Sequence, residues 1–198
     1  MTSQGDSPRE LQTTLAVIDM QRVFGDHDSP WLTPRFAEIV GPIQQLVRAY
    51  QPRVVFTRFV APGVPTGAWR SYYEQWPFAL QPPDARIYQL ADDFASDPGP
   101  TLDATTFGKW NGQLSEMVAG GRLMLAGVST DCCVLSTALA AADDGVGVRV
   151  VADACAGVTD ESHAKALDIL RLYSPIVEVV SLAEAIEQAP VPSPCGDA

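Results

Sequence analysis

Two adjacent cysteines, Cys132 and Cys133, have the residue type and the position that nucleophilic catalysis needs. They follow residues 123–126, a short apolar run typical of a buried strand, and precede residues 134–143, which are rich in Leu and Ala and have high helix propensity. The turn at residues 127–131 contains Gly, Ser, Thr and Asp, which break strands and cap helices. We therefore expect both cysteines in the first turn of a helix.

A thiol in such a turn is suited to act as a nucleophile. The unpaired N–H groups and the positive end of the helix dipole favour an anion there, which lowers the pKa of a thiol. The same N–H groups could hold the oxyanion of a tetrahedral intermediate. The alternative is that Cys132 and Cys133 are small buried hydrophobic residues, as most free cysteines are. This stretch alone leaves both interpretations open.

The composition is that of one globular domain. Of the 198 residues, 46% are hydrophobic and 19% are charged, and the formal net charge is −11. This charge argues against nucleic acid or an anionic membrane as a partner and leaves small-molecule substrates open. No apolar run reaches the ~18 residues of a membrane span, and residues 1–12 lack the apolar stretch of a signal peptide. The four cysteines have no disulfide-framework or metal-binding spacing, so we expect a cytoplasmic protein.

The order of apolar runs predicts alternating strands and helices. Residues 13–18 are almost continuously apolar, as in a strand covered on both faces, and end at Asp19. A helix over residues 34–50, kinked or divided at Gly41 and Pro42, and a strand over residues 53–57 complete a parallel βαβ unit. The later elements are strands at 86–90 (or a connector), 122–126, 147–152 and 176–180, helices at 111–119 and 159–173, and a final helix that begins with a capping box at Ser181 and Glu184.

These elements predict an α/β fold of three αβα layers, with a mostly parallel six-stranded sheet and helices on both faces. We expect one domain over residues 13–189, with flexible tails at residues 1–12 and 190–198. Ligands of such sheets bind beyond the carboxyl ends of the strands. Asp19 and the cysteine turn both lie at such ends. If their strands are neighbours, a carboxylate and a thiol share one cleft.

Three segments resemble the isochorismatase-like cysteine hydrolases. They are residues 16–21 (Ala-Val-Ile-Asp-Met-Gln), residues 107–110 (Phe-Gly-Lys-Trp) and residues 127–138 (Gly-Val-Ser-Thr-Asp-Cys-Cys-Val-Leu-Ser-Thr-Ala). That family includes nicotinamidases, N-carbamoylsarcosine amidases, ureido- and carbamate-cleaving amidases, and isochorismatase itself. The resemblance extends over most of the chain, and the third segment is the most specific.

The resemblance implies a triad of Asp19, Lys109 and Cys133. Asp19 matches the general base of the family, Lys109 its lysine, and Cys133 the nucleophile in the pattern Asp-any-Cys-Val. It also implies a cis peptide bond before Ser129 and an oxyanion hole made by the backbone N–H groups of Ser129 and Cys133. Cys132 is left with a packing role.

Each of these residues also has a structural interpretation. Asp19 could cap the following turn, Lys109 could be a solvated surface residue, and Asp131 fits a helix cap or a structural acid better than a catalytic group. Gln21 and Phe24 either line the substrate pocket or support Asp19.

Aromatic residues are concentrated in and near the irregular segment 58–100, and they could form a pocket rim or an oligomer interface. With Gln21 and Phe24, the residues Trp69 and Trp110 are our candidates for substrate binding. The other aromatic residues of this set are Tyr72, Tyr73 and Trp76. Arg58 and Arg70 could bind a substrate carboxylate or be solvated.

Departures from the family pattern narrow the expected function. Nicotinamidases have an Asp-any-His segment and a further His that together bind a metal, and residues 57–62 (Thr-Arg-Phe-Val-Ala-Pro) contain neither. We therefore expect no metal or other cofactor and disfavour nicotinamide. Isochorismatase, which cleaves a vinyl ether, acts without the cysteine. Because this chain has the cysteine, that reaction is disfavoured here. The resemblance then implies a hydrolase that cleaves a C–N bond of a small amide, carbamoyl or ureido substrate through a thioester, and a homo-oligomer, dimer or tetramer.

Three other functions stay open. The first is isochorismatase-type hydrolysis of another small metabolite. The second is a thiol redox protein that uses Cys132 and Cys133, although it lacks a Cys-x-x-Cys pair and leaves Asp19 and Lys109 without a role. The third is a binding protein on the same fold without activity, against which the complete triad argues.

Overall fold

The computed structural model describes residues 12–96 and 98–190, so the two predicted tails lie outside the described residues except at their inner ends. Its six strands form one parallel sheet in the order β3-β2-β1-β4-β5-β6. The strands are β1 (Thr13–Ile18), β2 (Val54–Phe59), β3 (Thr101–Ala104), β4 (Arg122–Val128), β5 (Val148–Ala156) and β6 (Val177–Val180). The predicted α/β class with a parallel six-stranded sheet is confirmed. No helix within the described ranges is long and apolar enough to cross a bilayer.

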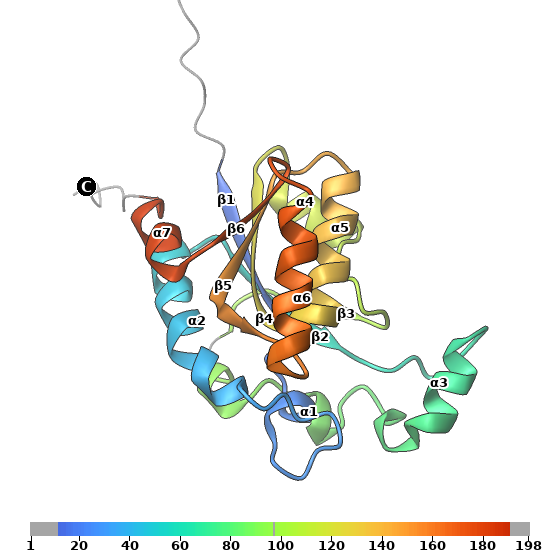
Figure 1. Cartoon of the computed structure of the whole chain (residues 1–198). Helices are drawn as coiled ribbons and strands as arrows, with labels where there is room; N and C mark the ends of the chain where they lie inside the picture. The colour runs from blue at the N-terminus through green and yellow to red at the C-terminus, as the bar shows by residue number, and fades with distance from the viewer. Residues whose placement is uncertain (1–11, 97, 191–198) are drawn as a thin grey trace, which may run out of the picture.

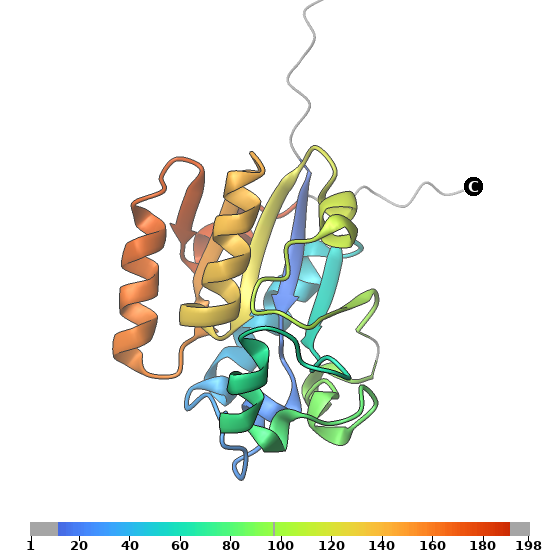
Figure 2. The same cartoon turned by 90° about the vertical axis from the view of Figure 1, so that its right-hand side faces the viewer.

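Helices cover both faces of the sheet (Figure 1, Figure 2). On one face lie α2 (Phe36–Tyr50) and α7 (Leu182–Glu187), and on the other lie α4 (Gly112–Val118), α5 (Leu135–Asp143) and α6 (Asp160–Arg171). Side chains of the central strand β1 alternate between two apolar cores, one on each side of the sheet. The short helices α1 (Arg22–Gly25) and α3 (Trp69–Gln75) lie beyond the carboxyl ends of the strands (Figure 1).

Several local predictions need correction. Helix α2 continues through Pro42, so the Gly-Pro pair does not divide it. The segment expected to be irregular contains α3, and Arg86–Tyr88 forms a 3₁₀ turn instead of a strand. Strand β3 is short and half exposed, so it lacks the apolar run that would have revealed it. Strand β5 extends to Ala156, which places Asp153 inside it, where the carboxylate accepts the N–H of Leu182.

The central strands β1 and β4 bring the two halves of the predicted cleft together. They are adjacent, and Ile18 pairs with Gly127. Gly127 has φ 116°, and a Cβ there would lie 2.1 Å from the carbonyl oxygen of Ile18, so only glycine permits this approach. The chain leaves β1 toward β2 on one side, and β4 continues toward β5 on the other. This reversal is the topological switch point at which such sheets bind ligands.

Candidate active site

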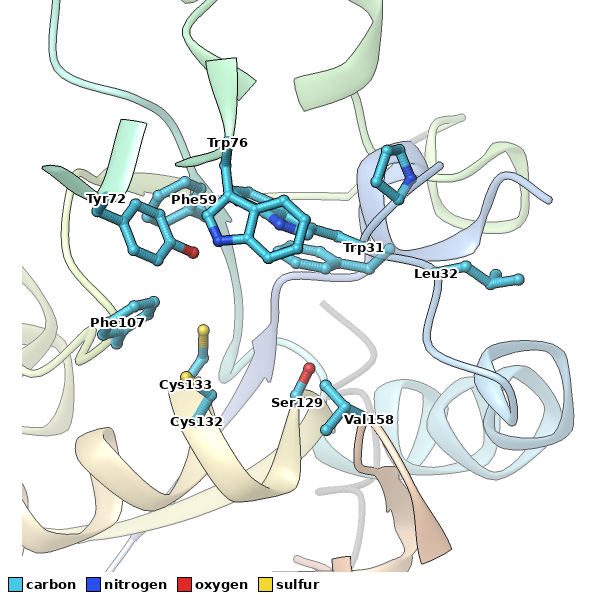
Figure 3. Close-up of a pocket in the computed structure, with 12 residues that line it drawn as sticks. Trp31, Leu32, Phe59, Tyr72, Trp76, Phe107, Ser129, Cys132, Cys133 and Val158 are labelled. Atoms are coloured by element: carbon cyan, nitrogen blue, oxygen red, sulfur yellow. The ribbon is translucent and has the colours of Figure 1, made fainter. Parts of the chain in front are cut away.

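The cysteine turn is wound more widely than an α-helix. Thr130–Val134 forms a π-helical turn that leads into α5. The backbone N–H groups of Cys132 and Val134 both donate to the carbonyl oxygen of Ser129, at 3.1 Å each. The peptide bond between Val128 and Ser129 is cis. This turn places the side chains of Ser129, Cys132 and Cys133 on one wall of a cavity (Figure 3).

The predicted capping side chains of this turn have other roles. None of them caps the helix. The Asp131 carboxylate accepts the backbone N–H of Val158 at 3.0 Å, which ties the cysteine turn to the loop between β5 and α6. The Thr130 hydroxyl lies 2.8 Å from Nδ1 of His163, whose pKa burial lowers. Asp131 is therefore a structural acid and not a helix cap, which were the two non-catalytic roles expected for it.

Asp19 immediately follows β1 and is fully buried, in a left-handed backbone conformation with φ 50°. The hydroxyl of Thr57, on β2, donates to Asp19 Oδ1 at 2.8 Å and accepts the Asp19 N–H at 3.2 Å. These two bonds fix the orientation of the carboxylate. Its other oxygen, Oδ2, lies 3.0 Å from Nζ of Lys109.

Lys109 is 1% exposed, so it is not a solvated surface residue. Its ammonium group pairs with Asp19, donates to the carbonyl oxygen of Thr106 at 2.8 Å, and lies 5.1 Å from the ring centroid of Phe59. A lysine can stay charged at such depth when a carboxylate and hydrogen bonds compensate for lost hydration. The structure thus brings together the carboxylate and the ammonium group that the sequence placed 90 residues apart in the chain.

The two thiols influence each other. Cys133 is 4% exposed, whereas Cys132 is half-buried. The hydrogen bond between the two thiol groups lowers the pKa of Cys132 and raises that of Cys133. Burial and the charge of Asp19 raise the pKa of Cys133 further, while Lys109 lowers it. This direction is opposite to the one that a helix N-terminus predicts, so Cys133 needs a base to become a thiolate.

The cavity in front of the cysteines has a volume of about 390 Å³. Aromatic and other apolar side chains make up the wall that faces the cysteines (Figure 3). The lining residues are Phe24, Pro30, Trp31, Leu32, Phe59, Tyr72, Trp76, Phe107, Ser129, Cys132, Cys133 and Val158. Neither histidine is among them, and the described residues contain no cluster of three His, Cys, Asp or Glu side chains suited to a metal.

Of the candidate substrate-binding residues, only Phe24 lines this cavity. The amide of Gln21 donates to the carbonyl oxygens of Phe59 and Tyr88, at 3.0 and 2.8 Å, and accepts the N–H of Phe59 at 2.7 Å. Because these bonds occupy both ends of its side chain, Gln21 supports the backbone around Asp19 instead of contacting substrate.

The two tryptophans that we expected at the pocket lie behind it or away from it. The centroid of the Trp69 ring lies 5.2 Å from that of Tyr72 and 5.1 Å from that of Phe107. Trp69 therefore supports two lining residues without lining the cavity itself. The Trp110 indole N–H donates to the Asp144 carboxylate at 2.9 Å. Both rings are amphipathic, and the sequence contains no signal that separates a supporting tryptophan from a lining one.

The arginines that could have bound a carboxylate are also placed elsewhere. Arg58 forms two hydrogen bonds of 2.7 Å with the Asp103 carboxylate, and Arg70 donates to the carbonyl oxygen of Pro65. Neither lines the cavity. Trp31 and Leu32, from the loop after α1, also line the cavity and were not predicted. Nothing in the composition of that loop indicates that it folds over the cysteines.

Comparison with known proteins identifies the family and the fold. The isochorismatase domain model matches residues 13–184. A cysteine hydrolase from Pseudomonas syringae pv. phaseolicola 1448A superposes with a TM-score of 0.78 at 21% identity, over 94% of this chain and 97% of that one. The N-carbamoylsarcosine amidase of Thermoplasma acidophilum superposes with a TM-score of 0.69 at 18% identity, over 87% of this chain and 97% of that one. The nicotinamidase of Bacillus subtilis superposes with a TM-score of 0.68 at 19% identity, over 86% of this chain and 100% of that one. Among curated proteins, no sequence matches.

Proposed function

The chain belongs to the isochorismatase family, and we propose that it is a cysteine-dependent hydrolase of a small amide, carbamoyl or ureido substrate. The observation that supports this most directly is the buried pair of Asp19 and Lys109, joined by a 3.0 Å contact, whose two charges both act on the pKa of the cavity-lining Cys133. A buried ion pair contributes little net stability by itself, whereas a base beside a thiol has a clear chemical use.

In the first step, Asp19 takes the proton of Cys133, and the thiolate attacks the carbonyl carbon of the substrate. The raised pKa of the Cys133 thiol makes such a base necessary. Thr57 keeps the carboxylate oriented for this transfer through its two hydrogen bonds with Asp19. Lys109 compensates for the negative charge of the site as the proton moves.

The tetrahedral intermediate carries its negative charge on the former carbonyl oxygen. We assign the stabilisation of this oxyanion to the backbone N–H groups of Ser129 and Cys133, because both residues line the cavity at the cysteine turn. The intermediate collapses with cleavage of the C–N bond. Asp19 returns its proton to the leaving nitrogen, and the acyl group stays on Cys133 as a thioester.

Hydrolysis of the thioester completes the cycle. Asp19, again ionised, removes a proton from a water molecule that attacks the thioester carbonyl. A second tetrahedral intermediate uses the same N–H groups, and its collapse releases the acid and a Cys133 thiolate, which regains the proton from Asp19. The proposed cycle uses only water and substrate. The absence of a metal or other cofactor stays a prediction. A cytoplasmic location and a dimeric or tetrameric state stay predictions.

Release of ammonia from a panel of small amides, ureas and carbamates tests the proposal. The wild-type protein should hydrolyse at least one of them, and Cys133→Ala should lose turnover with an unchanged circular dichroism spectrum. The matched control is Cys132→Ala, which alters the neighbouring thiol and should keep measurable turnover. If Cys133→Ala retains most of the activity, the nucleophile is assigned wrongly.

A further inference from the structure

The cavity beside Cys133 lacks charged side chains. None of the described residues that line it is an Asp, Glu, Lys, Arg or His, and six of them are aromatic. A charged group of a substrate would lose its hydration there without gaining a counter-ion, which is strongly unfavourable. A neutral apolar group would instead gain from leaving water.

The aromatic wall is held rigidly by contacts among its own rings. The ring of Trp31 lies at its centre. Its centroid is 6.1 Å from that of Phe24, with the rings stacked, 5.9 Å from that of Tyr72 and 6.0 Å from that of Trp76. Figure 3 shows Trp31 and Trp76 across the cavity from the cysteines. Preformed ring faces and edges of this kind suit a planar partner, because aromatic pairs prefer offset or edge-to-face contacts.

Two cations close to the lining residue Phe59 already have partners. Lys109, which lies over its ring, is paired with Asp19, and Arg58, which precedes Phe59 in β2, forms two hydrogen bonds with Asp103. A substrate carboxylate would have to break one of these pairs to use either charge, and Arg70, which donates to the carbonyl oxygen of Pro65, does not line the cavity.

An aromatic wall can also bind a cation through the faces of its rings. In this site, however, the ammonium group of Lys109 already lies over the ring of Phe59, a lining residue, at 5.1 Å from its centroid. A substrate cation would have to share that ring with Lys109, and no lining carboxylate would compensate for its lost hydration. The wall is thus suited to a neutral ring.

A few uncharged polar groups remain to orient a substrate. The hydroxyl of Tyr72 points from the aromatic wall toward the interior of the cavity in Figure 3, and that of Ser129 lies on the cysteine side. Burial raises the pKa of Tyr72 to about 12, and the charges of the two cysteines contribute, so its hydroxyl stays protonated and can donate a hydrogen bond.

We propose that the substrate is neutral and has a planar aromatic group, which binds against Trp31 and Trp76 while Tyr72 donates a hydrogen bond to the reacting amide, carbamoyl or ureido group. This inference rests on the hydrolase function proposed above. A volume of about 390 Å³ accommodates one or two fused rings with the reacting group attached.

Turnover of four amides with one common reacting group tests the inference: benzamide, acetamide, 4-carboxybenzamide and 4-(trimethylammonio)benzamide. We expect kcat/KM for benzamide to exceed that for acetamide by about tenfold or more, and those for the two charged analogues by about 100-fold. Tyr72→Phe should lower kcat/KM for benzamide by about tenfold, since it removes one hydroxyl and keeps the ring. If a charged analogue or acetamide is hydrolysed at least as well as benzamide, the inference is wrong and the hydrolase function stands.

Binding to Cys133→Ala, measured by calorimetry, separates the two proposals. Tighter binding of benzamide than of the charged analogues, without turnover of any amide, urea or carbamate of the panel by the wild-type protein, would support the inference and contradict the hydrolase function. Absence of benzamide binding together with absence of turnover across the whole panel would contradict both. Trp76→Ala should weaken benzamide binding about tenfold, whereas Trp110→Ala, which removes a tryptophan outside the cavity, should not change it. Equal effects of the two substitutions would also overturn the inference.

Discussion

The hydroxyl of Thr137 donates a hydrogen bond of 2.6 Å to the carbonyl oxygen of Cys133, one helical turn earlier. The same oxygen of Thr137 accepts the backbone N–H of Lys109 at 2.9 Å. Thr137 is fully buried, so one hydroxyl group joins the backbone of the proposed nucleophile to that of the lysine. We regard it as a positioning residue, because it acts on the site through the main chain.

Substitution of this threonine tests the role. Thr137→Val keeps the shape but removes the side-chain hydrogen bonds to two buried backbone groups, which should cost about 1–3 kcal/mol of the free energy of unfolding. We expect kcat to fall about tenfold with little change in KM. Thr137→Ser restores the hydroxyl and should recover most of kcat. A purely structural role would instead leave kcat of Thr137→Val, assayed well below its melting temperature, at the wild-type value.

The buried ion pair predicts opposite behaviour for single and double variants. Asp19→Asn and Lys109→Met each leave one buried charge without its partner, which should lower the free energy of unfolding by roughly 3–5 kcal/mol. Urea denaturation measures this loss. The double variant should be more stable than either single one, yet inactive. Retained activity in the double variant would exclude both residues from the chemistry.

Alkylation of Cys133 should depend on pH in a direction set by its two charged neighbours. The charge of Asp19 raises the pKa of Cys133 and that of Lys109 lowers it. Asp19→Asn should therefore move labelling by iodoacetamide to lower pH, and Lys109→Met should move it to higher pH. The measurement is mass spectrometry of the peptide that contains Cys133, in a Cys132→Ala background to remove the competing thiol. Unchanged profiles would show that neither charge acts on the thiol.

Gln21 should matter for stability and not for substrate binding. Gln21→Met removes its three hydrogen bonds to the backbone of Phe59 and Tyr88, which we expect to cost roughly 2–4 kcal/mol of the free energy of unfolding. KM should stay close to the wild-type value. Gln75 is exposed, so Gln75→Met is the matched control. It should leave the free energy of unfolding and KM unchanged. A large rise in KM for Gln21→Met alone would return this residue to the substrate pocket.

Local sequence determined the main elements of the fold. Continuous apolar runs marked the central strands, because strands buried on both faces cannot alternate with polar residues. The capping box of Ser181 and Glu184 predicted the start of α7, and the structure contains both of its hydrogen bonds. Strand β3 and helix α3 were not predicted. The first is short and half exposed, and the second has only seven residues and no side-chain cap, although Trp69, Tyr72 and Tyr73 have helical spacing.

Sequence also determined which residue types stand at the carboxyl ends of the central strands, and so which acid and which thiol were candidates. Only the tertiary structure decided that β1 and β4 are neighbours, that Lys109 reaches Asp19, and that Thr57 and Thr137 hold the site in place. It also decided that Trp31 and Trp76 form the cavity wall while Trp69 and Trp110 do not. The physical reason is that side chains distant in the chain meet through packing, which local propensity and spacing do not encode.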